Sequence, residues 1–570
     1  MSKSLKYLLG RRADILALLL ILLAMGIRIA LLISGWPAVN SEEGTFGLEA
    51  MHIAYRGEFP VFMYGQDYMG TLEAYVGALL FHLFGVSWFT LGLSMALLFA
   101  LFLVSIYFLT KLLYSAGMGL FILLLLCFGS IDMLIPETMM VGGAVETLIF
   151  GTLLLLLATR LSLSARQQLS ERKRWLRFAG FAAWGCCAGL GLWSHLLVTP
   201  FVLVSALLLL IFCHKEILSF APVALLLGFV LGLLPLILYN LYAAPGHSSL
   251  DAFLAVYATG SHTHLSLLYR LIKQFIGTFF FALPTITGLN PLYPSNPLPL
   301  PYFSSTRAPL LSILTVGGWS LGYVLLFVLA CYMAGKGLRQ LRKLYPGRGD
   351  LWNTKDRQMA VIYTAQLMLL LAATITIALF AFSSNAASRP WSTRYLIGLL
   401  VAMPAVLWPL WNGVNTYLAR FGPEPTSAFP ALIFRRALLI LLVCFFAYET
   451  VFATAAQTPA NIADNAQVQA ITHDLTRMGI THLYSGYWQC ERFMFQTQEA
   501  LTCAVVAEDI SKGFTRYKPY YVSVHNDPNT AYVFPVNSAF ANNFERKSAA
   551  QPGAFEQIFM DGYVVYIPQH

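Results

Sequence analysis

The chain has 570 residues, of which 58% are hydrophobic and only 11% are charged. No water-soluble domain needs that apolar content for its core, so most of the chain must lie in lipid. The formal net charge of +9 is not accompanied by a basic and aromatic nucleic-acid motif, so we exclude nucleic acid as a partner.

Apolar runs long enough to cross a bilayer recur along the first 456 positions. The first run is expected to stay as an anchor, because no small-residue cleavage site follows it. The sequence therefore predicts a mainly α-helical, multi-pass membrane protein with about eleven spans. We expect them at residues 14–34, 87–111, 117–135, 142–159, 178–195, 197–213, 218–241, 309–334, 359–382, 395–417 and 437–456.

Lys and Arg gather in one set of alternate loops: the N-terminus, residues 166–177, residues 335–358 and the region of Arg435 and Arg436. Cytoplasmic loops retain positive charge, so this pattern places the N-terminus inside. With an odd number of spans, the C-terminal segment lies outside the cytoplasm. Two long loops, 35–86 and 243–309, then also face outside.

From residue 457 to 570 the composition is that of a small soluble α/β domain, separate from the membrane domain at 1–456. A helical pattern stops at Gly479, and "THLYSGY", "ALTCAVV", "AYVFP" and "YVVYI" are typical of short strands. No catalytic motif occurs here, so we expect the domain to pack over the outer loops or to contact an acceptor. Cys490 and Cys503 share it, and spacing alone leaves open whether they form a disulfide.

The first outer loop begins with an acidic pair, Glu42 and Glu43. Ser41 is expected to cap a helix that ends at Gly57, and a second helix follows from about Met69; both are expected to lie along the membrane surface. The acids have two interpretations: they complement the helix dipole, or one is a general base that takes a proton from an acceptor hydroxyl.

The stretch that follows carries Tyr64, Gln66, Asp67 and Tyr68. Aromatic residues at this depth commonly anchor a protein at the membrane interface. Amides, carboxylates and aromatic faces also form carbohydrate sites, so these four residues are candidates for substrate binding as well.

Four further residues are candidates near the outer surface. Glu146 is a costly intramembrane carboxylate, with function or a buried partner such as Arg28 as alternatives. Arg389 and Arg394 oppose the positive-inside pattern and suit a phosphate, or else reach toward lipid head groups. His195 is a candidate hydrogen-bonding group, with a purely local role as the alternative.

The sequence supports no cofactor. His262 and His264 form an H-x-H pair without a clearly spaced acidic cluster, which is weak support for a divalent metal, and we assign no metal ligand.

The spans, the acidic pair and the outer C-terminal domain resemble the GT-C membrane glycosyltransferases. Within them the chain is similar to family 39, which includes protein O-mannosyltransferases and the aminoarabinose transferase of lipid A. More closely, "SEEGTFGLEAMHIAYRGEFPVFMYGQDYMGTLEA", "VGGAVETLIFG", "GLGLWSHLL", "LGLLPLILYN" and "STRYL" are similar to stretches of uncharacterised bacterial members.

The resemblance implies a polyprenyl-phosphate sugar donor, a phosphate held by outer basic residues, and inverting attack by an acceptor hydroxyl. The acceptor is a glycan, a lipid or a protein, and membrane lipids surround the chain. The carboxylate of the first outer loop removes the proton. Family members usually carry Asp and then Glu at this pair, whereas this chain has Glu42 in the first position.

Two other functions stay open at this level: a transporter or flippase of lipid-linked sugars, and a non-catalytic membrane assembly protein. A transporter predicts an intramembrane ionisable pathway and repeat-related halves. The candidate polar residues instead gather near the outer surface, which favours the transferase.

Overall fold

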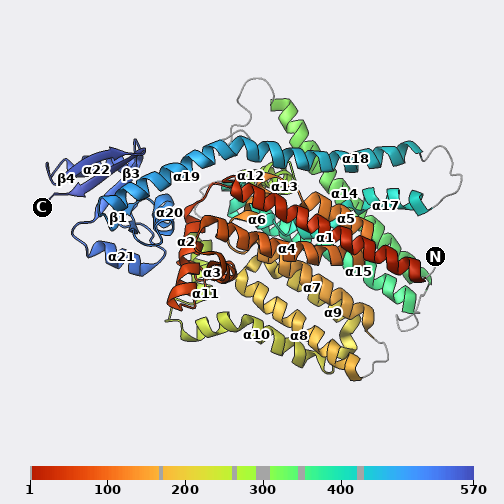
Figure 1. Ribbon diagram of the computed structural model, residues 1–570. Helices are drawn as coiled ribbons and strands as arrows, with labels where there is room; N and C mark the ends of the chain where they lie inside the picture. The colour runs from red at the N-terminus through yellow and green to blue at the C-terminus, as the bar shows by residue number, and fades with distance from the viewer. Residues whose placement is uncertain are drawn as a thin grey trace.

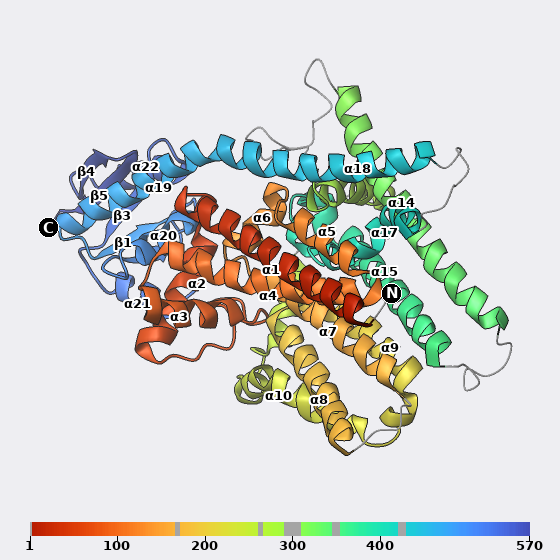
Figure 2. The same cartoon turned by 45° about the vertical axis from the view of Figure 1, so that its right-hand side comes forward.

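The computed structural model describes residues 3–165, 171–259, 266–289, 309–344, 354–419 and 429–569. Long helices form an elongated body, and a small domain with a β-sheet lies at one end of it (Figures 1 and 2). The N-terminus lies at the opposite end. The two ends of the body therefore differ in architecture.

Eight described helices or continuous helical runs are long and apolar enough to cross a membrane, which confirms a mainly helical, multi-pass membrane protein. They correspond to eight of the eleven predicted spans. They are α1 (Lys3–Ile33), α4 (Trp88–Leu113), α7 (Ala144–Ser164), η2 with α9 (Leu196–Val198 and Thr199–Ile217), α10 (Ala221–Tyr242), α14 (Pro309–Leu344), α15 (Thr354–Ala381), and α18, η7 and α19 (Phe429–Tyr448, Glu449–Ala453 and Thr454–Arg477).

The predicted span at 117–135 forms a bent pair of helices rather than one continuous helix. The helices α5 (Ala116–Leu126) and α6 (Ile131–Thr138) meet at a bend of 88°. At the break, the backbone N–H of Gly129 donates to the Thr450 hydroxyl at 2.8 Å, and the hydroxyl donates back to the Gly129 carbonyl at 3.0 Å. Hydrogen bonds to Thr450 of η7, far away in sequence, thus replace hydrogen bonds within the helix at this break.

Two other predicted spans form helices that lack either the length or the continuous apolar composition of a membrane-spanning helix. The helix α8 (Glu171–Ser194) carries glycines and tryptophans among its aliphatic residues, and it packs against α10. Within α17 (Leu399–Ala419), the apolar part that is described ends at Asn412.

The first outer loop forms α2 (Ser41–Met51), the π-helical turn η1 (His52–Arg56) and α3 (Leu72–Phe84). Gly57 ends the first helix with φ of 68°, as predicted. The predicted N-cap is wrong by one residue: the side chain of Asn40 accepts from the backbone N–H of Glu43 at 2.9 Å. Every residue of α2 except Glu42 is buried, so α2 is an internal helix rather than one exposed at a membrane surface.

The second outer loop contains α11 (Ser249–Thr259), α12 (Leu267–Gly277), η3 (Thr278–Ala282) and α13 (Leu283–Ile286). Its Pro-rich end, 290–308, and the pair His262 and His264 lie outside the described residues. Two short elements, α16 (Ser384–Ser388) and η5 (Thr393–Leu396), precede α17.

The C-terminal domain holds one mixed sheet in the order β2-β1-β3-β5-β4. β1 runs parallel to β2 and β3, and β5 runs antiparallel to β3 and β4. The sequence missed β4, an edge strand that carries polar residues such as Glu556 and Gln557. The elements are β1 (His482–Ser485), α20 (Tyr487–Gln496), β2 (Thr502–Val505), α21 (Lys518–His525), β3 (Ala531–Pro535), α22 (Ala539–Ser548), β4 (Phe555–Met560) and β5 (Tyr563–Pro568).

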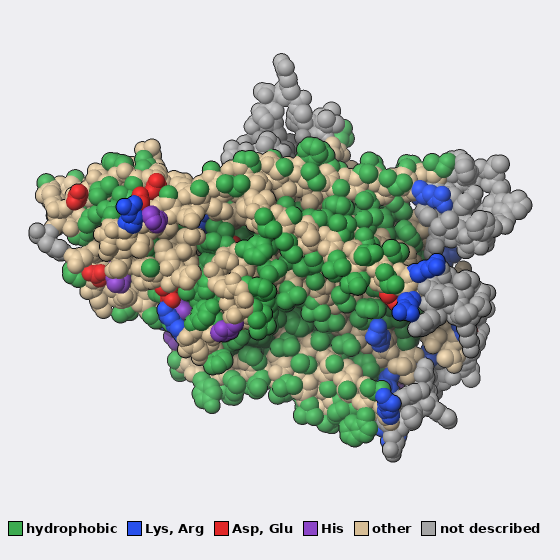
Figure 3. Space-filling model, viewed as in Figure 1, with side chains coloured by type: hydrophobic (Ala, Val, Ile, Leu, Met, Phe, Trp, Pro, Cys, Tyr) green, Lys and Arg blue, Asp and Glu red, His purple; other side chains and the backbone are tan. Residues whose placement is uncertain are grey.

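The surface of the helical body is largely apolar, and Lys and Arg side chains gather toward the end where the chain begins (Figure 3). Exposed leucines such as Leu16, Leu19 and Leu22 line α1. Exposed apolar side chains on a spanning helix are suited to lipid contact.

Candidate active site

Glu42 lies between two guanidinium groups where α2 meets the C-terminal domain. Its Oε2 is 3.3 Å from Nη1 of Arg394, and its Oε1 is 3.9 Å from Nη2 of Arg516. A quarter of the Glu42 side chain is exposed, against 3% for the whole of Glu43. The first turn of α2 therefore presents one carboxylate to solvent and buries the other.

Arg394 is held from two directions. Its Nη1 donates to the Val141 carbonyl at 3.1 Å as well as to Glu42. Next to it, the Thr393 hydroxyl donates to Asp132 at 3.0 Å, which ties η5 to α6. The side chain of Arg394 is 39% exposed.

Arg516 is a site residue that the sequence did not reveal. It comes from the segment between β2 and α21, and only 3% of its side chain is exposed. Its Nε donates to the Tyr487 hydroxyl at 2.8 Å, and its Nη1 donates to the Tyr64 carbonyl at 3.2 Å. No motif surrounds Arg516 in the sequence, so only the docking of the two parts of the chain identifies it.

Glu43 occupies a different environment from its neighbour. Burial raises the pKa of the Glu43 carboxyl to about 8, although the nearby Arg492 acts in the opposite direction. At neutral pH the protonated form of Glu43 thus prevails. Two adjacent glutamates are therefore distinguished by their surroundings.

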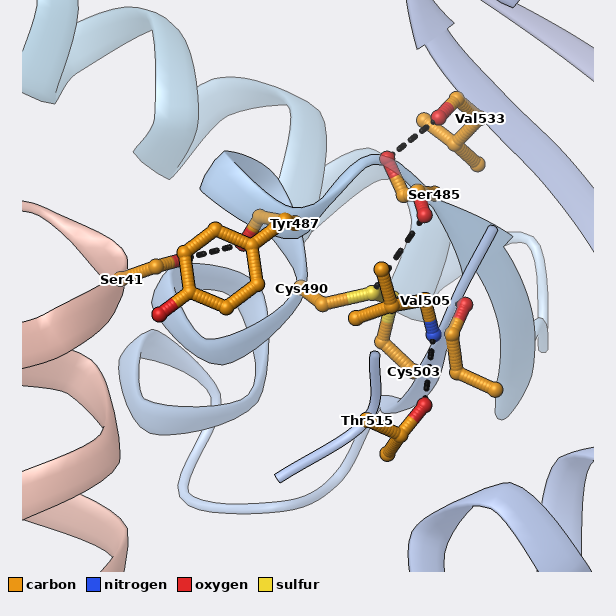
Figure 4. Close-up of a disulfide and its surroundings, with 9 residues drawn as sticks. Ser41, Ser485, Tyr487, Cys490, Cys503, Val505, Thr515 and Val533 are labelled. Carbon is orange, nitrogen blue, oxygen red and sulfur yellow. Dashed lines mark hydrogen bonds between the residues drawn. A yellow bond between two sulfur atoms is a disulfide. The ribbon is translucent and has the colours of Figure 1, made fainter. Parts of the chain in front are cut away.

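The hydroxyl of Ser41 fixes the start of α2 to the C-terminal domain, because it donates to the Tyr487 carbonyl at 2.6 Å (Figure 4). Tyr487 begins α20, which a disulfide between Cys490 and Cys503 joins to β2. The structure thus contains the disulfide that the sequence left open. It braces the helix that α2 packs against.

Tyr68 is the aromatic candidate whose hydroxyl interacts electrostatically with Glu42. Burial raises the pKa of the Tyr68 hydroxyl, Tyr395 and Glu42 act in the same direction, and Arg394 and Arg516 oppose them. Tyr68 thus belongs to the same electrostatic cluster as the two arginines.

Among the contacts described, none joins the other three candidates of this stretch to the Glu42 carboxylate. Tyr64 donates its hydroxyl to Glu58 at 2.8 Å and approaches His52 Nδ1 at 2.8 Å, so only its carbonyl touches the site, through Arg516. Asp67 interacts electrostatically with Tyr239 of α10. The backbone N–H of Gln66 donates to the Met63 carbonyl at 2.9 Å.

Glu146 is fully buried at the start of α7, and the expected alternative partner is wrong: Arg28 pairs with Glu137 instead. His195 accepts the backbone N–H of Leu197 at 3.1 Å; burial, aided by Arg394, lowers the pKa of its imidazole to about 4. Arg389 is exposed at the C-cap of α16. Among the contacts described, only Arg394 of the two candidate arginines reaches Glu42.

No protein-family model matches the chain, and no curated protein matches it. Solved structures do match. ArnT from Cupriavidus metallidurans in the apo state has a TM-score of 0.51 at 12% identity, covering 96% of this chain and 97% of ArnT. ArnT bound to undecaprenyl phosphate has a TM-score of 0.51 at 13% identity over the same shares. The chain has the GT-C fold.

The oligosaccharyltransferase of Archaeoglobus fulgidus in the apo form shares this GT-C fold, with a TM-score of 0.50 at 12% identity, over 97% of this chain and 74% of that one. The resemblance drawn from the sequence is thus confirmed at the level of the GT-C fold. Within the described ranges, no group of three or more His, Cys, Asp or Glu side chains is arranged to hold a metal ion.

Proposed function

We propose that this chain is an integral membrane glycosyltransferase, which transfers a sugar from a polyprenyl-phosphate carrier to an acceptor outside the cytoplasm. The observation that carries the proposal is the Glu42 carboxylate, exposed beside two guanidinium groups in a GT-C fold. That ArnT binds undecaprenyl phosphate supports the choice of donor class. The acceptor is a glycan, a lipid or a protein.

In the proposed reaction, an acceptor hydroxyl oxygen attacks the anomeric carbon of the sugar. The bond between that carbon and the phosphate oxygen breaks, the polyprenyl phosphate leaves, and the configuration inverts. Glu42 takes the proton of the attacking hydroxyl, a role that typically contributes about 10²–10⁴-fold in rate. Glu43 is a poorer base at neutral pH because it is buried and holds its own proton.

Arg394 and Arg516 have separate roles in the proposal. Arg394 is partly exposed, so its planar fork suits the donor phosphate and the charge that grows on it as the bond breaks. Arg516 is buried and held by Tyr487 and Tyr64, so it orients Glu42. Tyr68, which interacts electrostatically with both arginines, is proposed to line the sugar.

We further propose the orientation that the charge pattern favours, with the N-terminus in the cytoplasm and the Glu42 end outside. The boundary between the membrane domain and the C-terminal domain at residue 457 also stays a proposal, since α19 continues through it without a break. In this proposed orientation, the reaction takes place at the outer membrane surface.

The test offers a panel of radiolabelled polyprenyl-phosphate sugars, together with candidate glycan, lipid and protein acceptors, to the purified protein in proteoliposomes. The wild type is expected to release polyprenyl phosphate from at least one donor. Arg394→Ala is expected to weaken donor use by about 10–100-fold, as loss of a charge-assisted hydrogen bond implies. Arg389→Ala is the matched control and should have a smaller effect. Movement of the intact lipid across the bilayer without cleavage would instead establish the transporter.

A further inference from the structure

A glutamate of the first outer loop binds two tyrosines that are far apart in sequence. Glu58 follows Gly57, which ends the helical run of α2 and η1. Its Oε2 accepts from the Tyr64 hydroxyl at 2.8 Å, and its Oε1 accepts from the Tyr517 hydroxyl at 3.0 Å. One tyrosine belongs to the first outer loop and the other to the C-terminal domain, so Glu58 joins these two parts of the chain.

The two tyrosines also pack against each other. The centroids of the Tyr64 and Tyr517 rings are 4.6 Å apart, within the range in which aromatic rings attract each other. A carboxylate accepts on both of its oxygens at once, so it can hold both hydroxyl groups. Glu58 and the ring contact therefore keep residues 64 and 517 in one arrangement.

Arg516 is attached to both tyrosines. The carbonyl of Tyr64 accepts from Nη1 of Arg516 at 3.2 Å, and Tyr517 is the next residue after Arg516 in the chain. The side chain of Arg516 is thus attached to one tyrosine and its backbone to the other. The hydrogen bonds of Glu58 relate these two attachments to each other.

The turn after Tyr64 brings the two segments into close contact. Gly65 has φ of 73°, a conformation that favours glycine. A Cβ atom on Gly65 would lie 3.2 Å from Cα of Arg516 and 2.8 Å from Cζ of Phe514. The backbone of this turn therefore lies directly against the segment that carries Arg516.

Glu42 alone does not fix the direction of the Arg516 guanidinium. The distance from Nη2 of Arg516 to Oε1 of Glu42 is 3.9 Å, which is beyond hydrogen-bond distance. The hydrogen bonds that orient the guanidinium are those to the Tyr487 hydroxyl and to the Tyr64 carbonyl. A displacement of Tyr64 relative to residue 516 would therefore move the guanidinium away from the carboxylate.

We propose that Glu58 is a positioning residue, which holds Tyr64 against Tyr517 and thereby sets the guanidinium of Arg516 beside Glu42. This inference rests on the proposed function in one respect, that Glu42 is the base. Among the contacts described, none joins Glu58 to Glu42 directly. The Glu58 side chain is 33% exposed and both tyrosines are half-buried, so variants here leave polar groups that water can reach, and they are expected to fold.

Tyr520 provides a matched control in the same interface, three residues beyond Tyr517. Its hydroxyl donates to Oε1 of Glu499 at 2.7 Å and lies 3.1 Å from Nε2 of His52 in η1. No contact described joins the Tyr520 side chain to Arg516. Tyr520→Phe therefore weakens the same interface without affecting the attachments of Arg516.

Initial rates of sugar transfer by the purified full-length protein in proteoliposomes test the proposal. We expect Glu58→Ala to lower kcat about tenfold and Tyr517→Phe about threefold, with little change in the KM for the donor. Tyr520→Phe should keep the kcat of the wild type. Unchanged kcat in Glu58→Ala would overturn the proposal, and so would equal losses in Tyr517→Phe and Tyr520→Phe.

A double-mutant cycle separates positioning from general destabilisation. In an Arg516→Ala background, Glu58→Ala should lower kcat no further, because the side chain that Glu58 positions is absent. A loss of the same size in both backgrounds would mean that Glu58 does not act through Arg516.

A second measurement does not depend on catalysis. Structures of the wild type and of Glu58→Ala, determined by cryo-electron microscopy, should differ in the Arg516 side chain, which is expected to leave the Tyr64 carbonyl and Glu42. An unmoved Arg516 would overturn the proposal even if the protein is a transferase. If the wild type transfers no sugar, the proposed function is wrong, while the position of Arg516 in Glu58→Ala still decides whether Glu58 sets it.

Discussion

Glu42 and Glu43 are identical in chemistry and adjacent in sequence, yet α2 turns them toward opposite surroundings. Glu42 faces Arg394 and Arg516 at a partly exposed surface, whereas Glu43 is buried. The sequence identifies the pair but not the difference in exposure between its two members. Neighbouring side chains on a helix point about 100° apart, and only the packing decides which side of the helix is covered.

The buried carboxyl of Glu43 predicts a pH dependence of stability. Its pKa rises from an ordinary 4.5 to about 8 in the folded protein. Between these values the folded state holds a proton that the unfolded state has released, so stability should fall as pH rises, by at most about 1.4 kcal/mol per pH unit.

Thermal inactivation of wild type and Glu43→Gln, measured from pH 5 to pH 9, checks this expectation. The wild type should lose more stability than Glu43→Gln as pH rises, and the difference should level off above about pH 8. Glu491, whose pKa burial raises to about 7, contributes equally to both proteins and cancels in the comparison. Parallel curves would contradict a buried, protonated Glu43.

We expect Arg516 to affect catalysis by positioning Glu42 rather than by binding the donor. Arg516→Lys keeps the charge but loses the paired contacts with Tyr487 and Tyr64. We expect a reduction in kcat of about tenfold with little change in the KM for the donor, measured by initial rates. A rise in KM alone would instead indicate that Arg516 binds the donor.

Among the elements, α2 shows which structural features the sequence patterns predict and which they do not. Its start near residue 41, and the end at Gly57 of the helical run that it forms with η1, could be read from a polar cap and a glycine. Its burial could not, because α20 covers it from more than 400 residues away in sequence. The bend between α5 and α6 is similar, since the Thr450 hydroxyl that bonds Gly129 comes from η7.

The disulfide between Cys490 and Cys503 is expected to stabilise the support of α2. Closing a loop of this length contributes about 3 kcal/mol in the chain-entropy view. The Cys490→Ser/Cys503→Ser variant should therefore unfold at a lower temperature and lose activity on mild heating. Cys444→Ser, which removes an exposed free thiol, is the control. Equal unfolding temperatures for the disulfide variant and the wild type would contradict this role.

At the scale of the whole molecule, apolar runs and the order of short sequence stretches were enough to predict a multi-pass GT-C fold, because both are local properties of the chain. The completed site was not predictable to the same degree. It joins Glu42 of α2, Arg394 of η5 and Arg516 of the C-terminal domain, and no local pattern specifies how these parts dock.

The orientation of the molecule gives a separate prediction. In a Cys444→Ser background, Asp561→Cys in the turn after β4 should react with a membrane-impermeant maleimide on intact cells. Lys343→Cys, near the end of α14, should react only after the membrane is permeabilised. Both positions are exposed. The reverse pattern would place the N-terminus and the basic loops outside, against the charge distribution.

The assignment of Glu42 as the base is the central claim, and a side-by-side rate measurement tests it most directly. Sugar transfer from the accepted polyprenyl-phosphate donor is measured for the wild type, Glu42→Gln and Glu43→Gln. Glu42→Gln is expected to lose at least about 100-fold in rate, whereas Glu43→Gln should keep most of it. Full activity in Glu42→Gln, or loss confined to Glu43→Gln, would contradict the account.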